Sequence, residues 1–512
     1  MMFSNRNMKF PLFLILSFSF LFVFPLAGSP YSSINIPVSD RVYDQLDKLI
    51  GHGLIKNVIM GQRPWSRMEM GRMVKEARDN LKQICKEEDR DINCLEKGNL
   101  GFAILKNLEG EFAEEIGFLD NKKYSKPVSF HPLSNLQVSY TFLDSPSRII
   151  PFDNNVGKIQ AVLNPLVQNK EGRHYVDGSN FALESQHWFR LTKFFSFNAI
   201  PRFEGLFPDQ GANDANIIAQ NFYGKFTFHK LELEFGRDSL VWGQGKHGGI
   251  ILSDNARPLD MLKLSNDRLV HIPVLGNFKG TLYVANLGPE QEFKKSFFSG
   301  LKLSFEPAKW LELGFSRALI IGGQDAPQPS AGDVFKEFFF SRGGFLSSSG
   351  IQDQNFSNSI YGWEFRFRIP PWHNTAFYFE MFSDDSFFSR YRTNWAYYTG
   401  FYVPRIDFNG KFDFRFEFKN FPALFYRHGT FLSGWTLNQQ ILGDPLGPDS
   451  RSFMAEIFYT VNIKHRLGLK FEHASRDSDI WIVPGPSKEF VISNDNPSEK
   501  RMSFVITGDH QV

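Results

Sequence analysis

Residues 411–419, KFDFRFEFK, alternate strictly between charged and aromatic side chains. Successive side chains of a β-strand point to opposite faces, so residues two apart share a face. One face of the stretch is therefore aromatic (Phe412, Phe414, Phe416 and Phe418) and the other is charged (Asp413, Arg415 and Glu417). The stretch WEFRFRI, residues 363–369, repeats the scheme with charges at Glu364, Arg366 and Arg368. Both stretches predict strands with one aromatic and one charged face.

Two kinds of sheet accommodate such strands. In a soluble sandwich the charges face water and the aromatic rings face the core. In an outer-membrane barrel the rings face lipid and the charges face a hydrated lumen. Further strands are predicted at 136–143, 157–166, 185–196, 196–206, 218–229, 230–237, 278–287, 297–305, 309–319, 374–383, 395–403, 453–461, 463–473 and 500–507. Many approach the roughly ten residues that a tilted strand needs to cross the hydrocarbon layer, which favours the barrel.

The composition agrees with a barrel that contacts outer-membrane lipid. The chain has 512 residues, of which 57 are phenylalanine and 16% are aromatic, and its net charge of +2 gives no electrostatic reason to expect nucleic acid as a partner. Aromatic residues near strand ends suggest interfacial girdles (Trp372, Trp395, Tyr397, Tyr398, Tyr402 and Trp435). We predict an all-β antiparallel transmembrane barrel of roughly 16–18 strands over residues 129–512, present as a monomer.

Residues 1–29 have the three parts of a secretory signal peptide. Arg6 and Lys9 supply the positive start, residues 10–26 form the apolar core, and Ala27-Gly28-Ser29 offers small residues for cleavage. An uncleaved membrane anchor is the alternative. The protein is therefore predicted to leave the cytoplasm.

Residues 30–128 show helical spacing of apolar residues, unlike the rest of the chain. Ser39 is the predicted cap of a first helix that ends at Gly51 and Gly53. Ser66, with Glu69 three residues later, forms a capping box for a second helix. A third helical run covers residues 100–119. We predict a helical plug domain over 30–128.

The chain has two cysteines, Cys85 and Cys94, which lie close together in the sequence of an exported protein. A disulfide that closes the loop between them is the favoured interpretation, because disulfides persist in oxidising compartments. Without a nearby pair of histidines they make a poor zinc site, and we predict no metal.

A glycine-rich stretch, GRDSLVWGQGKHGGIILSDNARP, covers residues 236–258. Glycine tolerates close backbone approach, so this many glycines beside Trp242 indicate backbone packed tightly against another part of the protein. The run Gly243-x-Gly245-Lys246 is not a phosphate loop, because no Ser or Thr follows the lysine. No metal-binding motif accompanies it. We predict a protein without catalytic activity and without a cofactor.

The same stretch offers side chains suited to sugar recognition, in which aromatic faces contact pyranose rings and charged or amide groups bind hydroxyls. The candidate polysaccharide-binding residues are Arg237, Asp238, Trp242, Asn255 and Arg257. The alternative is structural. Arg237 and Asp238 would then pair with each other or with a neighbouring strand, since a charged lumen needs internal pairing, and Trp242 would be packing.

Three segments resemble the Wzi-type capsule assembly proteins. They are Gly236-Arg237 with Trp242-Gly243-x-Gly245, then Leu252-Ser253-x-Asn255-Ala256-Arg257-Pro258, and, near the amino terminus, Ile36-Pro37 with Arg63-Pro64-Trp65-Ser66. The resemblance implies a barrel in the bacterial outer membrane, with an amino-terminal helical bundle filling its periplasmic end. It also implies a non-catalytic lectin that holds capsular polysaccharide or exopolysaccharide at the cell surface.

Two other functions stay open. Inward-facing arginines and acidic residues suit a porin or a substrate-specific channel equally well. An outer-membrane hydrolase is the second alternative, because the serine and histidine of such an enzyme need not be adjacent in the sequence.

Overall fold

The computed structural model describes residues 30–87, 99–120, 126–151, 160–164, 166–169, 171–327, 330, 332, 334, 338, 357–384, 395–407, 409–423, 425–428, 430–476, 480–482, 491–493 and 498–510. The predicted signal peptide and Cys94 lie outside these residues. Cys85 is buried in the hydrophobic core of the helices, and its disulfide with Cys94 stays a prediction.

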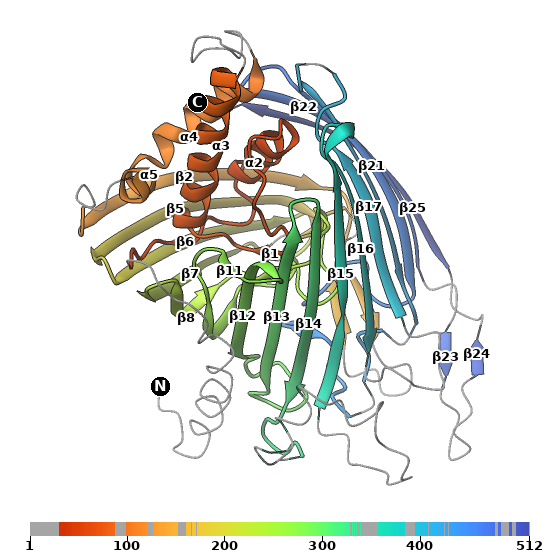
Figure 1. Cartoon of the computed structure of the whole chain (residues 1–512). Helices are drawn as coiled ribbons and strands as arrows, with labels where there is room; N and C mark the ends of the chain where they lie inside the picture. The colour runs from red at the N-terminus through yellow and green to blue at the C-terminus, as the bar shows by residue number, and fades with distance from the viewer. Residues whose placement is uncertain are drawn as a thin grey trace.

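The fold is one antiparallel barrel, in which each strand pairs with the next along the chain (Figure 1). Its seventeen strands, among the described residues, are β2 (Ser129–Leu143), β5 (Gly178–Thr192), β6 (Phe195–Pro208), β7 (Asp214–Phe228), β8 (Leu231–Asp238), β10 (Leu259–Asn266), β11 (Val270–Ile272), β12 (Gly276–Asn286), β13 (Phe297–Ala308), β14 (Leu311–Ile321), β15 (Ser357–Ile369), β16 (Thr375–Asp384), β17 (Trp395–Val403), β18 (Phe412–Phe421), β21 (Ser450–Thr460), β22 (His465–Arg476) and β25 (Glu499–His510). Strands β10 and β11 pair with successive parts of β12, so they occupy one position in the sheet. The predicted all-β transmembrane barrel of roughly 16–18 strands is confirmed.

The remaining strands are short and pair outside the main sheet. They are β1 (Gln62–Arg63) with β9 (Val241–Trp242), β3 (Arg148–Pro151) with β4 (Gln160–Leu163), β19 (Thr436–Leu437) with β20 (Gln440–Ile441), and β23 (Ile480–Ile482) with β24 (Val491–Ser493). The pair β23–β24 lies at the end of the barrel away from the helices (Figure 1).

The alternation in the sequence sorts side chains between the two faces of the wall as predicted. In β18, Asp413, Arg415 and Glu417 are buried inside, whereas the phenylalanines between them are partly exposed. Strand β15 behaves in the same way. The predicted girdle is wrong at Tyr398, Tyr402 and Trp435, which are buried and belong to the core inside the barrel. Closeness to a strand end therefore did not predict which face an aromatic residue occupies.

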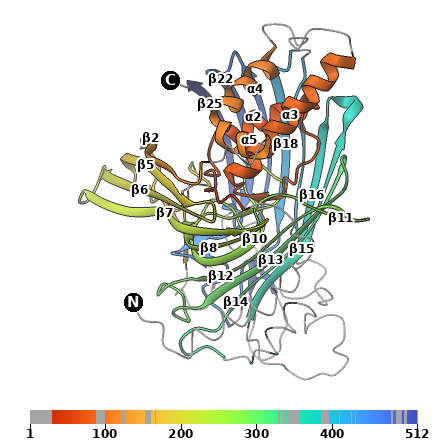
Figure 2. The same cartoon turned by 60° about the vertical axis from the view of Figure 1, so that its left-hand side comes forward.

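Four of the described helices cover one end of the barrel, the end at which the chain also finishes (Figures 1 and 2). They are α2 (Val42–Gly51), α3 (Arg67–Glu87), α4 (Leu100–Glu111) and α5 (Ala113–Asp120). A one-turn helix, η3 (Pro370–Trp372), connects β15 to β16 at the same end. No described helix is both long and apolar enough to cross a membrane.

The helix boundaries follow from local capping, with two departures from the prediction. The Ser66 hydroxyl accepts a hydrogen bond from the Glu69 N–H at 3.1 Å, as a capping serine does. The predicted cap at Ser39 is wrong, because the Asp40 carboxylate caps the Val42 N–H at 2.9 Å instead. The predicted third helix is divided at Phe112, where the backbone leaves helical geometry.

Buried ion pairs dock helix α2 against the inside of the wall. The Lys48 ammonium lies 2.6 Å from the Asp413 carboxylate of β18, and both side chains are buried. Asp44 contacts Lys246 at 2.5 Å and Arg466 at 2.7 Å. Burial alone would raise the pKa of Asp44, but these two cations outweigh it and hold that pKa below its ordinary value. The helical domain is thus held to the barrel by one buried and two partly exposed charge pairs.

The Lys48–Asp413 pair gives a direct test of this docking. Lys48→Met removes one partner of a buried pair and leaves the Asp413 carboxylate poorly compensated, which costs about 3 kcal/mol. The helical circular dichroism signal is expected to melt at a lower temperature than in the wild-type chain. Lys56→Met, at an exposed lysine of the same domain, is the matched control and should leave the melting unchanged. Equal melting of both variants would contradict the docking.

Candidate functional site

The segment between β8 and β10, residues 239–258, turns into the barrel. Its first residues form β9, whose Trp242 pairs with Gln62 of β1. A second segment, residues 57–66, thus meets the first inside the barrel. Together they are called here the two lumenal segments.

Backbone N–H groups of segment 239–258 donate to carboxylates of the opposite wall. Gln244 and Gly245 donate to Glu380 of β16, at 2.6 and 3.1 Å. The Lys246 N–H donates to Glu417 of β18 at 2.8 Å. Both carboxylates are fully buried. Because backbone N–H groups removed from water need acceptors, these contacts fix the segment across the lumen.

Segment 57–66 is held in the same way. The N–H groups of Met60 and Gly61 donate to the Glu312 carboxylate of β14, at 2.8 and 3.0 Å. The Gln62 side-chain amide donates to Ser304 and accepts from Thr281, at 2.9 and 2.8 Å. The wall therefore supplies acceptors for both lumenal segments.

The glycines of segment 239–258 are required by this close approach. A Cβ atom on Gly245 would lie 2.2 Å from the Tyr398 ring. Gly243 has a φ of +145°, which side-chain-bearing residues rarely adopt, and its Cβ would lie 2.9 Å from Glu380. The predicted tight packing of this backbone is confirmed.

The other half of the segment packs under the long connection between β18 and β21. The Trp435 indole N–H donates to the Ile251 carbonyl at 2.9 Å, and the Tyr426 hydroxyl donates to the Ile250 carbonyl at 2.6 Å. The Asn255 amide donates to the Ile441 carbonyl at 3.0 Å. Segment 239–258 thus contacts the helical domain through Lys246 and the opposite end of the barrel through these residues.

Of the five residues predicted to bind polysaccharide, three are buried. Trp242 packs edge-to-face on Tyr283, with ring centroids 5.3 Å apart. Asn255 is committed to the Ile441 carbonyl. Asp238 faces the lumen, where its carboxylate accepts from Asn35 at 2.7 Å and from Asn221 at 2.6 Å.

The two arginines lie elsewhere. Arg237 occupies the face of β8 opposite to Asp238, and its guanidinium binds the Asp260 carboxylate with two hydrogen bonds, at 2.7 and 2.8 Å. Arg257 approaches the same carboxylate at 3.9 Å. Both arginines thus approach the Asp260 carboxylate, whereas Trp242 and Asn255 contact other partners, so a role of all five in one glycan site stays a prediction.

Charges that point into the lumen are largely matched by opposite charges. Lys263 pairs with Glu234 at 2.8 Å, and Lys419 pairs with Asp444 at 2.7 Å.

On segment 239–258, burial and then the nearby Glu171 carboxylate raise the pKa of Asp254 to about 7. Among the described residues, no group of three or more His, Cys, Asp or Glu side chains could hold a metal ion.

The sequence did not single out Glu312 and Glu380 as anchors of the lumenal segments. Their strands were predicted, and alternation along 374–383 places Glu380 on the face shared with the inward residues. The sequence could not predict that Gln244 is the partner of Glu380, because the two residues are 136 positions apart.

Gly245 provides a test of the lumenal packing. Gly245→Ala is expected to force Tyr398 and Glu417 apart, because the Tyr398 hydroxyl donates to that carboxylate at 2.7 Å. Overpacking of this kind costs about 1–3 kcal/mol, so the detergent-solubilised barrel should unfold at a lower temperature on heat-modifiability gels.

Gly110→Ala is the matched control, because a Cβ there meets nothing within 4 Å and alanine favours the helix. Unfolding of the Gly245 variant at the wild-type temperature would show that the segment is not packed as described.

An antiparallel barrel with an aromatic outer face and charged lumenal face is the architecture of bacterial outer-membrane proteins. The family model of the capsule assembly protein Wzi matches residues 152–510. The chain therefore belongs to the Wzi capsule assembly family, and it is a protein of the bacterial outer membrane.

Two individual proteins extend this comparison. The chain is 25% identical, over 183 residues, to an uncharacterized 55.8 kDa protein in the cps region of Klebsiella pneumoniae, and the match covers 34% of each chain, about a third of that protein's length. It is similar in fold to a solved structure of Wzi, described as an outer membrane protein involved in group 1 capsule assembly in Escherichia coli and as a carbohydrate-binding β-barrel. That similarity has a TM-score of 0.59 and 15% identity, and covers 87% of this chain and 86% of the other.

Proposed function

We propose that this protein is a non-catalytic lectin that binds capsular polysaccharide or exopolysaccharide and retains it at the cell surface. The main support is structural: two lumenal segments cross the barrel and are held by carboxylates of the wall. A lumen crossed in this way favours an activity at the outer surface over passage of solutes through the barrel. Membership of the capsule assembly family supports a polysaccharide as the ligand.

The lengths of the connections differ between the two ends of the barrel and indicate which end faces the outside of the cell. Strands near the helical end are joined by short turns, such as 193–194 between β5 and β6. The connections at the other end are long, and the one between β18 and β21 spans residues 422–449. Barrels of this class have short periplasmic turns and long extracellular loops. The helices accordingly face the periplasm, and the long connections face the polysaccharide.

The solved Wzi structure of similar fold is described as carbohydrate-binding. Carried over to this chain as part of the proposal, that property places polysaccharide binding on the outer connections. The internal pairing of Lys263 and Lys419 argues against an ion pathway.

The proposal predicts where polysaccharide is found after the protein is removed. A strain lacking this protein should make the same total amount of polysaccharide, with the cell-bound fraction reduced and the fraction in the medium increased. Complementation with the wild-type chain should restore the cell-bound fraction. Quantification of polysaccharide in washed cells and in the medium checks this.

Two outcomes would count against the proposal. Unchanged cell-bound and shed fractions would exclude retention. A fall in total polysaccharide, with the same share bound to cells, would indicate a role in production or export.

A further inference from the structure

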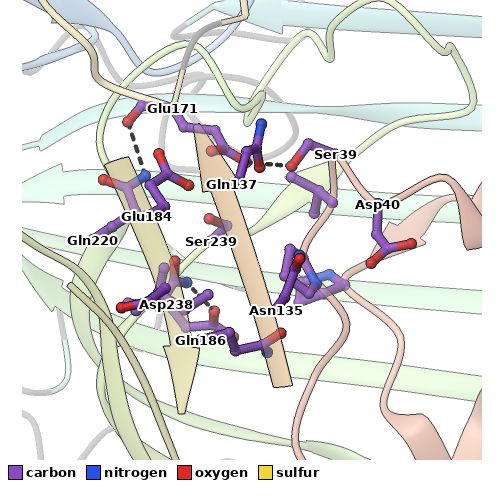
Figure 3. A pocket seen from close by; sticks show the side chains of 16 residues that line it. Ser39, Asp40, Asn135, Gln137, Glu171, Glu184, Gln186, Gln220, Asp238 and Ser239 are labelled. Carbon is purple, nitrogen blue, oxygen red and sulfur yellow. Dashed lines mark hydrogen bonds between the residues drawn. The ribbon is translucent and has the colours of Figure 1, made fainter. Parts of the chain in front are cut away.

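A polar cavity lies inside the barrel between the amino-terminal segment and the wall formed by β2, β5, β6 and β7 (Figure 3). Its volume is about 110 Å³. Since a buried water needs roughly 10–15 Å³ of such volume, the cavity has room for about eight waters, which is the space of a single sugar ring. Asp238 is the one predicted polysaccharide-binding residue that lines it.

Four carboxylates line the cavity, and each already has a hydrogen-bond donor. Glu184 binds Arg202, and Glu171 accepts from the Ser39 hydroxyl at 3.1 Å. Asp238 accepts from two amides, and Asp40 caps helix α2. Because each carboxylate already accepts a hydrogen bond from the protein, the cavity offers hydrogen-bonded acceptor oxygens to a neutral donor.

Amide side chains supply the complementary donors and acceptors. Gln220 donates to the Glu171 carbonyl at 3.0 Å. Asn135 and Gln137, on β2, are exposed and form the open side of the cavity. An amide side chain carries both donors and an acceptor, so these amides can donate a hydrogen bond to a hydroxyl group or accept one from it. Figure 3 shows these side chains and the carboxylates arranged around one space.

Among the described residues that line the cavity there is no lysine, arginine or histidine, and the neighbouring Arg202 is already paired with Glu184. A sugar that carries a carboxylate would therefore meet carboxylates without a cation to receive its charge, which disfavours its binding. Pro37, Pro64 and Ile200 add a small apolar surface suited to the C–H face of a sugar ring. The chemistry selects polyhydroxylated and uncharged ligands.

We infer that this cavity is a subsite for one neutral sugar unit, separate from the polysaccharide-binding surface at the outer connections. Asn135 and Gln137 bind the hydroxyls at its open side, and the four carboxylates accept hydroxyl hydrogen bonds inside. The inference rests on the proposed function, because the sugar unit would belong to the polysaccharide that the protein retains.

The test uses the purified full chain in a detergent without a sugar headgroup. Saturation-transfer NMR is recorded with methyl glucoside and methyl galactoside as neutral probes and with glucuronate as the acidic probe. Transfer to a neutral probe and none to glucuronate is expected. Gln137→Leu or Asn135→Leu removes one hydrogen-bonding group, so the affinity for the neutral probe should fall about fivefold to tenfold.

The matched control is Asn216→Leu, the same change at an exposed residue of β7 that does not line the cavity, and it should bind the neutral probe as the wild type does. Absence of transfer to both neutral probes, equal transfer to glucuronate, or an unchanged affinity in both β2 variants would overturn the inference. The cell-bound share of polysaccharide is measured separately. If that share depends on the protein while the probes do not bind, the subsite is wrong and the retention function stands.

Discussion

Hydrogen bonds from backbone N–H groups to carboxylates of the inner wall determine how the lumen of the barrel is filled. Glu312, Glu380 and Glu417 are buried, and a buried carboxylate without donors would be strongly destabilising. The two lumenal segments supply those donors from their main chains. The wall carboxylates therefore need the donors that the two lumenal segments supply. The N–H groups of these segments are removed from water and need the wall carboxylates as acceptors.

The same arrangement connects the two ends of the molecule. Segment 239–258 reaches helix α2 through Lys246 and Asp44, and it reaches the long outer connection through Ile251 and Trp435. The helical domain, the lumen and the outer end thus form one packed interior. A protein built in this way suits stable attachment of a ligand at its surface.

The sequence predicted the class of fold because its decisive signals are local. Alternation of phenylalanine and charge in β18 identifies lipid-facing and lumenal faces without knowledge of the neighbouring strands, and Ser66 identifies the start of α3. The glycines of 239–258 correctly indicated close backbone approach. The partners of that backbone could not be predicted, because they depend on register across the barrel. Asp238 and Asn35, for example, are 203 residues apart in the sequence and in direct contact in the fold.

The conductance of the wild-type chain in a planar lipid bilayer tests directly whether the two lumenal segments close the barrel. A lumen crossed by two segments anchored on Glu312, Glu380 and Glu417 predicts insertion into the bilayer without open-channel current steps. Stable, porin-like steps from the intact protein would show that the segments do not close the lumen. They would also favour a channel over the retention of polysaccharide.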